Sequence, residues 1–204
     1  MSNIHLIRHG ETHWNLEHRA QGSMNSNLTE RGKTQAREAM VKIEAVEFDA
    51  AYSSSSGRAL ETAKILLADK STPIIGLDEL KEIDMGAWEG KTWSEIQSTY
   101  GEQYEYFWKR PSQYQPINGE TFEVFTERAI NVFNHITSTN SDSNILIVSH
   151  AAFIKTLVTK LLSRPIDEIW DEPYAGNLSH TILNKTLDGQ YRVTKFCDHD
   201  WSHG

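Results

Sequence analysis

The sequence contains a single cysteine, Cys197, among 204 residues. One cysteine excludes an intrachain disulfide and a thiolate metal cluster, because each needs at least two. Long apolar runs are also missing, since no stretch approaches the ~18 consecutive apolar residues of a transmembrane helix. The beginning of the chain is too short in apolar length, and is charged too soon, for a secretory signal peptide. We therefore expect no membrane association and a cytoplasmic location.

Positive charge is scarce. The chain has 20 lysines and arginines against 28 aspartates and glutamates, which gives a formal net charge of −8 with the histidines neutral. Binding a polyanion requires a basic surface, so this balance argues against a nucleic-acid partner. An acidic exterior is still compatible with a locally positive pocket. A small phosphorylated metabolite therefore stays open as a partner.

Apolar residues are distributed as short runs separated by amphipathic stretches. The runs lack alternation, as do fully buried strands of a parallel sheet, and the stretches between them have helical periodicity. The order predicts an α/β fold, namely a three-layer α/β/α sandwich with a mostly parallel central sheet flanked by helices on both faces. The expected strands are 3–8, 50–53, 73–77, 145–148, 181–183 and 191–196, and the expected helices are 29–46, 58–68, 121–137 and 151–162, with another capped by Thr92.

The chain shows no internal repeat, linker or low-complexity segment, so we expect one domain over residues 1–204. The alternation of strands and helices pauses at residues 80–120, which we expect to form an insertion or lid over the site. Aromatic residues are dense between Tyr100 and Tyr114. Packing explains them better than a binding platform does, although both interpretations stay open.

Charged and polar side chains follow three of the predicted strands directly. Arg8 and His9 end the first strand, a serine-rich loop after the second leads to Arg58, and His150 follows the fourth. Ligands bind beyond the carboxyl ends of the strands in an open α/β sheet. Guanidinium groups and helix N-termini both suit phosphate oxygens. The sequence therefore predicts a phosphate site at this edge, with Glu82 in a strand-exit loop as its general acid.

Several motifs in this order resemble those of the histidine phosphatase superfamily, also called phosphoglycerate mutase-like. They run from residue 6 to about 155. A lone Arg-His-Gly would be weak evidence for the family, but four motifs in the same order are strong evidence. The four main motifs are Arg8-His9-Gly10-Glu11-Thr12 with Asn15, Ser53-Ser54 through Arg58-Ala59 and Thr62-Ala63, Glu82 with Gly86 and Trp88-Glu89-Gly90, and Ser149-His150. The chain departs from the family pattern after His150, where alanines replace glycines, and in segment 21–29, which we expect to influence the choice of substrate.

The resemblance implies a role for each matching position. His9 would be the nucleophile that becomes phosphohistidine, and Glu82 would protonate the leaving oxygen and then help to activate water. The phosphoryl oxygens would be held by Arg8, Arg58 and His150. Further phosphate or substrate contacts are expected from Asn15, Gln21, Gly22 and the backbone N–H of Ala151. Because the arginines replace a metal, we expect no metal ion and no cofactor.

The reaction predicted in this way is hydrolysis of a small phosphomonoester. A cofactor-dependent phosphoglycerate mutase is the runner-up, but a mutase needs extra cations to retain a bisphosphorylated intermediate, and residues 83–86 are acidic and apolar. A non-catalytic protein that binds a phosphorylated ligand is the alternative outside the enzymes. A metal-dependent hydrolase is a further alternative, and it would lose activity in the presence of a chelator.

Lys91, Lys109 and Arg110 are candidates to bind a second anionic group of the substrate, although exposed surface charge explains them better. The natural substrate and the oligomeric state are left open.

Overall fold

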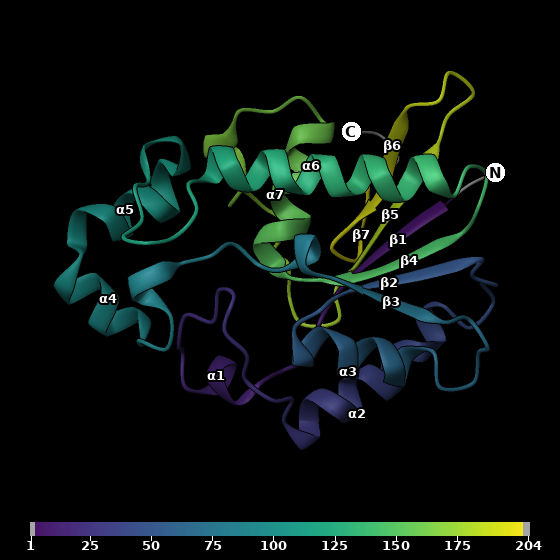
Figure 1. The fold of residues 1–204 in the computed structure, drawn as a ribbon, viewed down its shortest axis with the longest axis horizontal. Coiled ribbons are helices and arrows are strands. Elements are labelled where there is room, and N and C mark those ends of the chain that lie inside the picture. Colours follow the sequence, from purple (N-terminus) through teal and green to yellow (C-terminus); the bar gives the residue numbers. More distant parts are fainter. Residues whose placement is uncertain (1–2, 202–204) are drawn as a thin grey trace.

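The central sheet has seven strands in a computed structural model that describes residues 3–201. Their order across the sheet is β3-β2-β4-β1-β5-β6-β7 (Figure 1). The strands are β1 (Asn3–Arg8), β2 (Ala50–Ser54), β3 (Ile74–Leu77), β4 (Ile145–Ser149), β5 (His180–Lys185), β6 (Tyr191–Phe196) and β7 (His199–Asp200). β3, β2, β4 and β1 run parallel to their neighbours. β5 pairs antiparallel with β1, and β6 and β7 follow it in antiparallel order, so the sheet is mixed and mostly parallel at its core. Short hairpins join β5, β6 and β7, and such short connections are possible only between antiparallel strands.

Helices cover both faces of the sheet, and the predicted three-layer sandwich is confirmed. α2 (Glu30–Ala39) and α3 (Gly57–Leu66) lie on one face, and α6 (Phe122–Thr139) and α7 (Ala151–Leu161) lie on the other (Figure 1). Alternate residues of the strands face opposite layers. In β1, Ile4 and Leu6 belong to the core under α6 and α7, whereas Ile7 belongs to the core under α2 and α3.

The helix starts follow the capping residues predicted from the sequence. Thr29, Thr92 and Thr121 each accept a hydrogen bond from the backbone N–H three residues later. The first long helix is shorter than the expected 29–46, because α2 ends at Ala39 and a 3₁₀ turn over Met40–Lys42 follows. Ile43 is nevertheless fully buried. The apolar periodicity therefore predicted the burial of this residue correctly, but the prediction that the helix continues to residue 46 was wrong.

The segment 80–120 lies beyond the carboxyl ends of the parallel strands. It holds α4 (Trp93–Thr99) and α5 (Gly101–Lys109), which project from the sandwich on the same side as the short α1 (His13–Leu16) (Figure 1). Its aromatic residues pack on one another and on the main core. Phe107 lies 5.6 Å from Trp88 and 5.2 Å from Phe122 between ring centroids. The role of this segment as a lid stays a prediction.

Over residues 3–201, no helix combines the length and the apolar character that crossing a membrane requires.

Candidate active site

The carboxyl ends of β1, β4 and β2 bring the predicted polar residues together. Arg8 is paired with Ser149 at the ends of β1 and β4, and the His9 N–H donates to the Ser149 carbonyl at 3.0 Å. The ring centroids of His9 and His150 are 5.2 Å apart as a result. The register of parallel strands therefore places residues about 140 positions apart in the chain at one edge, as the sequence predicted.

The two ring nitrogens of His9 have different partners. Nδ1 lies 2.8 Å from the Gly10 carbonyl, and the Arg58 Nε–H donates to Nε2 at 3.3 Å. Because a guanidinium only donates, Nε2 is the acceptor and the ring proton is on Nδ1. Burial lowers the pKa of His9 well below its usual value, the charges of Arg58 and Arg8 add to this, and the Gly10 carbonyl opposes it. The imidazole is therefore neutral, with its lone pair on Nε2.

Arg58 is a fully buried cation that is held by backbone carbonyls. Its Nη1 donates to the Met24 carbonyl at 2.5 Å, and its Nη2 donates to the Gly22 carbonyl at 2.8 Å. Burial lowers its pKa to about 10, Glu82 and Glu89 oppose that shift and Arg8 adds to it, so the guanidinium stays charged at neutral pH. The two carbonyls fix the orientation of the guanidinium through Nη1 and Nη2, and this orientation directs Nε at His9.

Arg8 and His150 each keep one buried nitrogen without a partner among the described residues. Arg8 Nη1 donates to the Ala175 carbonyl at 2.6 Å, while its Nε is unpaired. His150 Nε2 lies 2.8 Å from the Ser54 hydroxyl, while its Nδ1 is unpaired. Burial, followed by the charge of Arg58, lowers the pKa of His150 well below its usual value. Unpaired buried polar nitrogens are uncommon in folded proteins and are consistent with an anionic ligand.

Glu82 lies at the N-terminus of α7. Its carboxylate accepts hydrogen bonds from the backbone N–H groups of Ala152 and Phe153, both at 3.1 Å. Burial raises its pKa, while the N–H bonds of Ala152 and Ile83 and the charges of Arg58 and Arg8 lower it, and burial dominates. A raised pKa keeps a carboxylic acid protonated closer to neutral pH, which suits a general acid.

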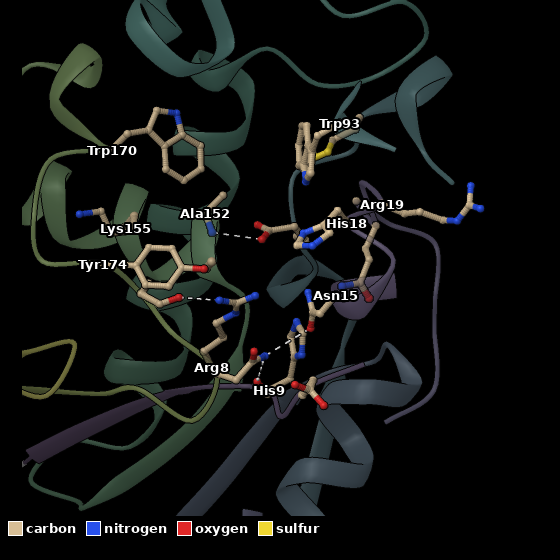
Figure 2. A pocket seen from close by; sticks show the side chains of 18 of the residues that line it. Arg8, His9, Asn15, His18, Arg19, Trp93, Ala152, Lys155, Trp170 and Tyr174 are labelled. Atoms are coloured by element: carbon tan, nitrogen blue, oxygen red, sulfur yellow. Dashed lines mark hydrogen bonds between the residues drawn. The ribbon is translucent and has the colours of Figure 1, made fainter. Parts of the chain in front are cut away.

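A cavity of about 490 Å³ opens at this edge of the sheet (Figure 2). Its walls include nearly every residue predicted for the site, namely Arg8, His9, Asn15, Gln21, Gly22, Arg58, Glu82 and Ala151. His150 is not among the lining residues and lies behind, beside the His9 ring. Of the neighbouring acids Glu79, Asp84 and Glu89, none lines the cavity, so the geometry favours Glu82 as the acid.

Several predicted binding residues already have partners in the protein. The Asn15 side-chain oxygen accepts from the Thr12 N–H at 3.1 Å, and the Gln21 side-chain oxygen accepts from the Thr12 hydroxyl at 3.1 Å. The Gly22 carbonyl is occupied by Arg58. Substrate contacts from these three residues, and from the N–H of Ala151, stay predictions.

Segment 170–177 contributes to the site, although no site residue in it was predicted from the sequence. Asn177 donates to the His9 carbonyl at 3.0 Å, and Trp170 and Tyr174 line the cavity. No periodicity or motif marks this segment as part of the site. It arrives there because residues 178–179 continue the antiparallel pairing with Arg8.

Three histidines spaced four apart, His5, His9 and His13, do not converge. His5 Nδ1 lies 2.9 Å from Nε2 of His180, and His13 is exposed on α1. Within residues 3–201, no group of three or more histidine, cysteine or acidic side chains is arranged to hold a metal ion.

Glu89 is a positioning residue for Arg58. Its carboxylate accepts from the N–H groups of Ser23 at 2.7 Å and Met24 at 3.1 Å, and so orients the turn whose carbonyls hold the guanidinium. A Cβ added at Gly22, which has φ +50°, would lie 2.1 Å from a Glu89 carboxylate oxygen. The turn therefore depends on a glycine and a carboxylate together. In the sequence, the Trp88-Glu89-Gly90 motif marked Glu89 only as part of the family pattern and gave no indication of this contact.

A family model described as the Histidine phosphatase superfamily (branch 1) matches residues 4–198. The chain belongs to this superfamily. It is 39% identical to the solved structure of Bacillus stearothermophilus YhfR, with a TM-score of 0.91 and 95% of both chains covered. It is also 31% identical to the adenosylcobalamin/alpha-ribazole phosphatase of Escherichia coli (strain K12), over 81% of each chain.

A phosphoserine phosphatase from Entamoeba histolytica, solved in complex with 3-phosphoglyceric acid, has a TM-score of 0.85 at 30% identity, with 97% of both chains covered. Another structure of a phosphoserine phosphatase from this organism, a mutant, holds phosphoserine. Relatives also include a 2,3-bisphosphoglycerate-dependent phosphoglycerate mutase from Parvibaculum lavamentivorans, 31% identical over 76% of this chain and 78% of its own. The homologues are thus phosphatases and mutases.

We expect Glu89→Gln to lower kcat/KM by about 10- to 100-fold, the scale expected when a catalytic group is displaced. An amide in either orientation sets an N–H against a backbone N–H of Ser23 or Met24, so the turn under Arg58 shifts. The measurement is kcat/KM for p-nitrophenyl phosphate together with the inhibition constant of orthovanadate, which reports phosphate binding directly.

The matched control is Glu105→Gln, since Glu105 is an exposed acid of α5 that pairs with Lys109. Circular dichroism monitors folding of both variants. Unchanged vanadate inhibition in folded Glu89→Gln would contradict the positioning role.

Proposed function

We propose that this protein hydrolyses a small phosphomonoester through a phosphohistidine intermediate on His9, without a metal ion. The observation that carries the proposal is the fixed tautomer of His9, whose Nε2 lone pair faces the buried Arg58 guanidinium. A nucleophile held neutral beside a fixed cation can attack a phosphorus atom whose oxygens the same cation stabilises. The phosphatase relatives support this reaction class.

The first step forms a bond from His9 Nε2 to phosphorus and breaks the bond from phosphorus to the alcohol oxygen. Arg58 exchanges its contact with Nε2 for a phosphoryl oxygen, and the unpaired Nε of Arg8 supplies a second positive donor. Phosphoryl transfer depends mainly on positioning and charge stabilisation, so these cations are the main catalytic device. The proton of Glu82 goes to the departing alcohol.

The second step returns the enzyme to its starting state. The ionised Glu82 takes a proton from water while the water oxygen attacks the phosphorus atom, and the bond from phosphorus to His9 Nε2 breaks. Inorganic phosphate leaves, with Glu82 protonated and the Nε2 lone pair restored. A raised pKa suits both roles of Glu82, because the group must give and take a proton near the working pH.

Mutase activity is the second candidate, because phosphoglycerate mutases are among the relatives. A mutase must keep a doubly phosphorylated intermediate, which requires cations beyond Arg8 and Arg58. The two other lysine or arginine side chains that line the cavity, Arg19 and Lys155, already bond to Glu17 and to backbone carbonyls. Hydrolysis is therefore favoured over mutase activity.

His9→Ala should lower the turnover of phosphomonoesters at least ~1,000-fold, as removal of a nucleophile does in other enzymes. The wild-type protein, quenched during turnover of a ³²P-labelled substrate, should carry label that is labile to acid and stable to base, as expected of a phosphohistidine. The variant should carry none. His13→Ala is the control, because His13 is exposed and does not line the cavity.

The same assay is run with excess chelator. Undiminished activity is expected, and loss of activity that returns on adding a divalent metal would favour a metal-dependent hydrolase instead. A folded wild-type protein that binds vanadate and turns over no phosphomonoester would favour a non-catalytic binding protein.

Glu82→Gln should reduce kcat/KM for alkyl phosphates by ~100- to 10,000-fold, the usual contribution of a general acid. The kcat/KM of aryl phosphates covers only the steps up to release of the alcohol, and it should fall much less, because their leaving groups need little protonation. In the wild type, kcat for alkyl phosphates should fall as pH rises through the raised pKa of Glu82, because the protonated form is the acid. Equal losses for both substrate types, or an unchanged pH profile in the variant, would contradict the acid role.

Incubation with 3-phosphoglycerate and catalytic 2,3-bisphosphoglycerate separates the two reactions. We expect released phosphate to exceed 2-phosphoglycerate formed, because Arg19 and Lys155, which line the cavity besides Arg8 and Arg58, are already bonded within the protein. Both products are quantified by ³¹P NMR in one sample. Isomer exchange that outruns phosphate release would identify a mutase.

A further inference from the structure

The end of the cavity away from His9 has aromatic walls. Trp93 and Trp170 stand on opposite sides of it, above Arg8 and His9 (Figure 2). Phe107, Trp108 and Tyr174 also line the cavity. These rings come from α4, α5 and the segment 170–177. The phosphate end and the aromatic end therefore belong to one continuous cavity.

The aromatic walls are held in place before any ligand binds. Trp108 packs against Trp170 with ring centroids 4.8 Å apart and against Trp93 at 5.3 Å. The Trp170 indole N–H donates to the Phe107 carbonyl at 2.6 Å, which fixes the plane of that ring. Trp93, Trp108 and Trp170 all keep part of their surface exposed. Fixed, partly exposed rings favour the binding of a flat apolar group, because little side-chain entropy is lost.

Cations at this end are already engaged. Lys155 is buried, its Nζ donates to the carbonyls of Asp171 and Pro173, and it lies 4.8 Å from the centroid of the Phe196 ring. Arg19 donates to the Glu17 carboxylate and to the Gly90 carbonyl, and its guanidinium points away from the cavity in Figure 2.

The remaining charges and polar groups do not favour a second anion. The carboxylate of Glu172 adds negative charge to the lining, and Lys91, Lys109 and Arg110 do not line the cavity. His18 lines it as well. Among residues 3–201, a carboxylate or second phosphate on the substrate would therefore meet no unengaged lysine or arginine in the cavity wall beyond Arg8 and Arg58.

We propose that the preferred substrate is a phosphomonoester whose alcohol carries a flat aromatic group and no second anionic group. This inference rests on the proposed hydrolysis at His9. The cavity of about 490 Å³ falls within the roughly 300–1,000 Å³ of pockets for ligands of drug size, far beyond the needs of a phosphate group. The substrate class thus differs from phosphoserine and 3-phosphoglycerate, which carry a carboxylate close to the phosphate.

The test compares three primary alkyl phosphates, so that the chemistry of the leaving oxygen stays similar. They are 2-(1-naphthyl)ethyl phosphate, ethyl phosphate and 3-phosphoglycerate. We expect kcat/KM for the naphthyl compound to exceed that of each of the others by about tenfold or more, as is typical when a pocket buries additional apolar groups. Equal values for the naphthyl and ethyl compounds, or a higher value for 3-phosphoglycerate, would overturn the proposal.

Variants locate the effect in the aromatic end. Tyr174→Ala should reduce kcat/KM for the naphthyl compound by roughly 3- to 10-fold and that for ethyl phosphate by clearly less, since a partial aromatic contact is lost. Tyr174 is 75% exposed, so its removal leaves the core intact. Tyr106→Ala is the control, because Tyr106 lies on α5 and does not line the cavity. A parallel loss on both substrates would contradict a contact between Tyr174 and the aromatic group.

Binding to the His9→Ala variant, measured by calorimetry, distinguishes this inference from the reaction itself. If no compound is turned over, the proposed hydrolysis fails, and the order of the dissociation constants still tests the aromatic site. Tightest binding of the naphthyl compound supports the inference, and equal binding of all three refutes it.

Discussion

The active site depends on the burial of one guanidinium group. Arg58 is 1% exposed, and a buried charge is tolerated only where it is fully hydrogen bonded. Its partners are the carbonyls of Gly22 and Met24 and the Nε2 of His9, and Glu89 in turn orients the turn that carries the carbonyls. The need to satisfy this cation explains why a loop at residues 22–24 and a motif at residues 88–90 are joined so closely.

The charge of Arg58 also affects the pKa values of the other titrating groups in the site. The charge of Arg58 adds to burial in lowering the pKa of His9 and of His150, so both imidazoles are neutral. Burial raises the pKa of Glu82 against the opposing effect of Arg58. A neutral imidazole and a carboxylic acid with a raised pKa therefore lie in one cavity, which suits attack and leaving-group protonation in the proposed first step.

Much of this protein could be predicted without the structure. Apolar runs too short for helices identified β1 and β4 as buried strands, and β2 and β3 were also located as strands. The threonine caps marked the starts of α2, α4 and α6. Parallel strands place their carboxyl ends together, so Arg8, His9, Arg58 and His150 could be grouped from their positions at strand ends alone. The end of the first long helix was misjudged, because apolar periodicity continues through Ile43, which is buried without being helical.

The sequence by itself determined the sandwich and the residues that meet at its edge, because both follow from local patterns and from strand direction. Only the tertiary structure decided what surrounds them. Segment 170–177 reaches the cavity because the residues that follow it pair with Arg8 of β1. Lys155 donates hydrogen bonds to backbone carbonyls and Arg19 donates to Glu17, so neither cation is available to a ligand. Such contacts depend on where distant segments pack, which no local pattern records. The aromatic end of the cavity is therefore visible only in the folded chain.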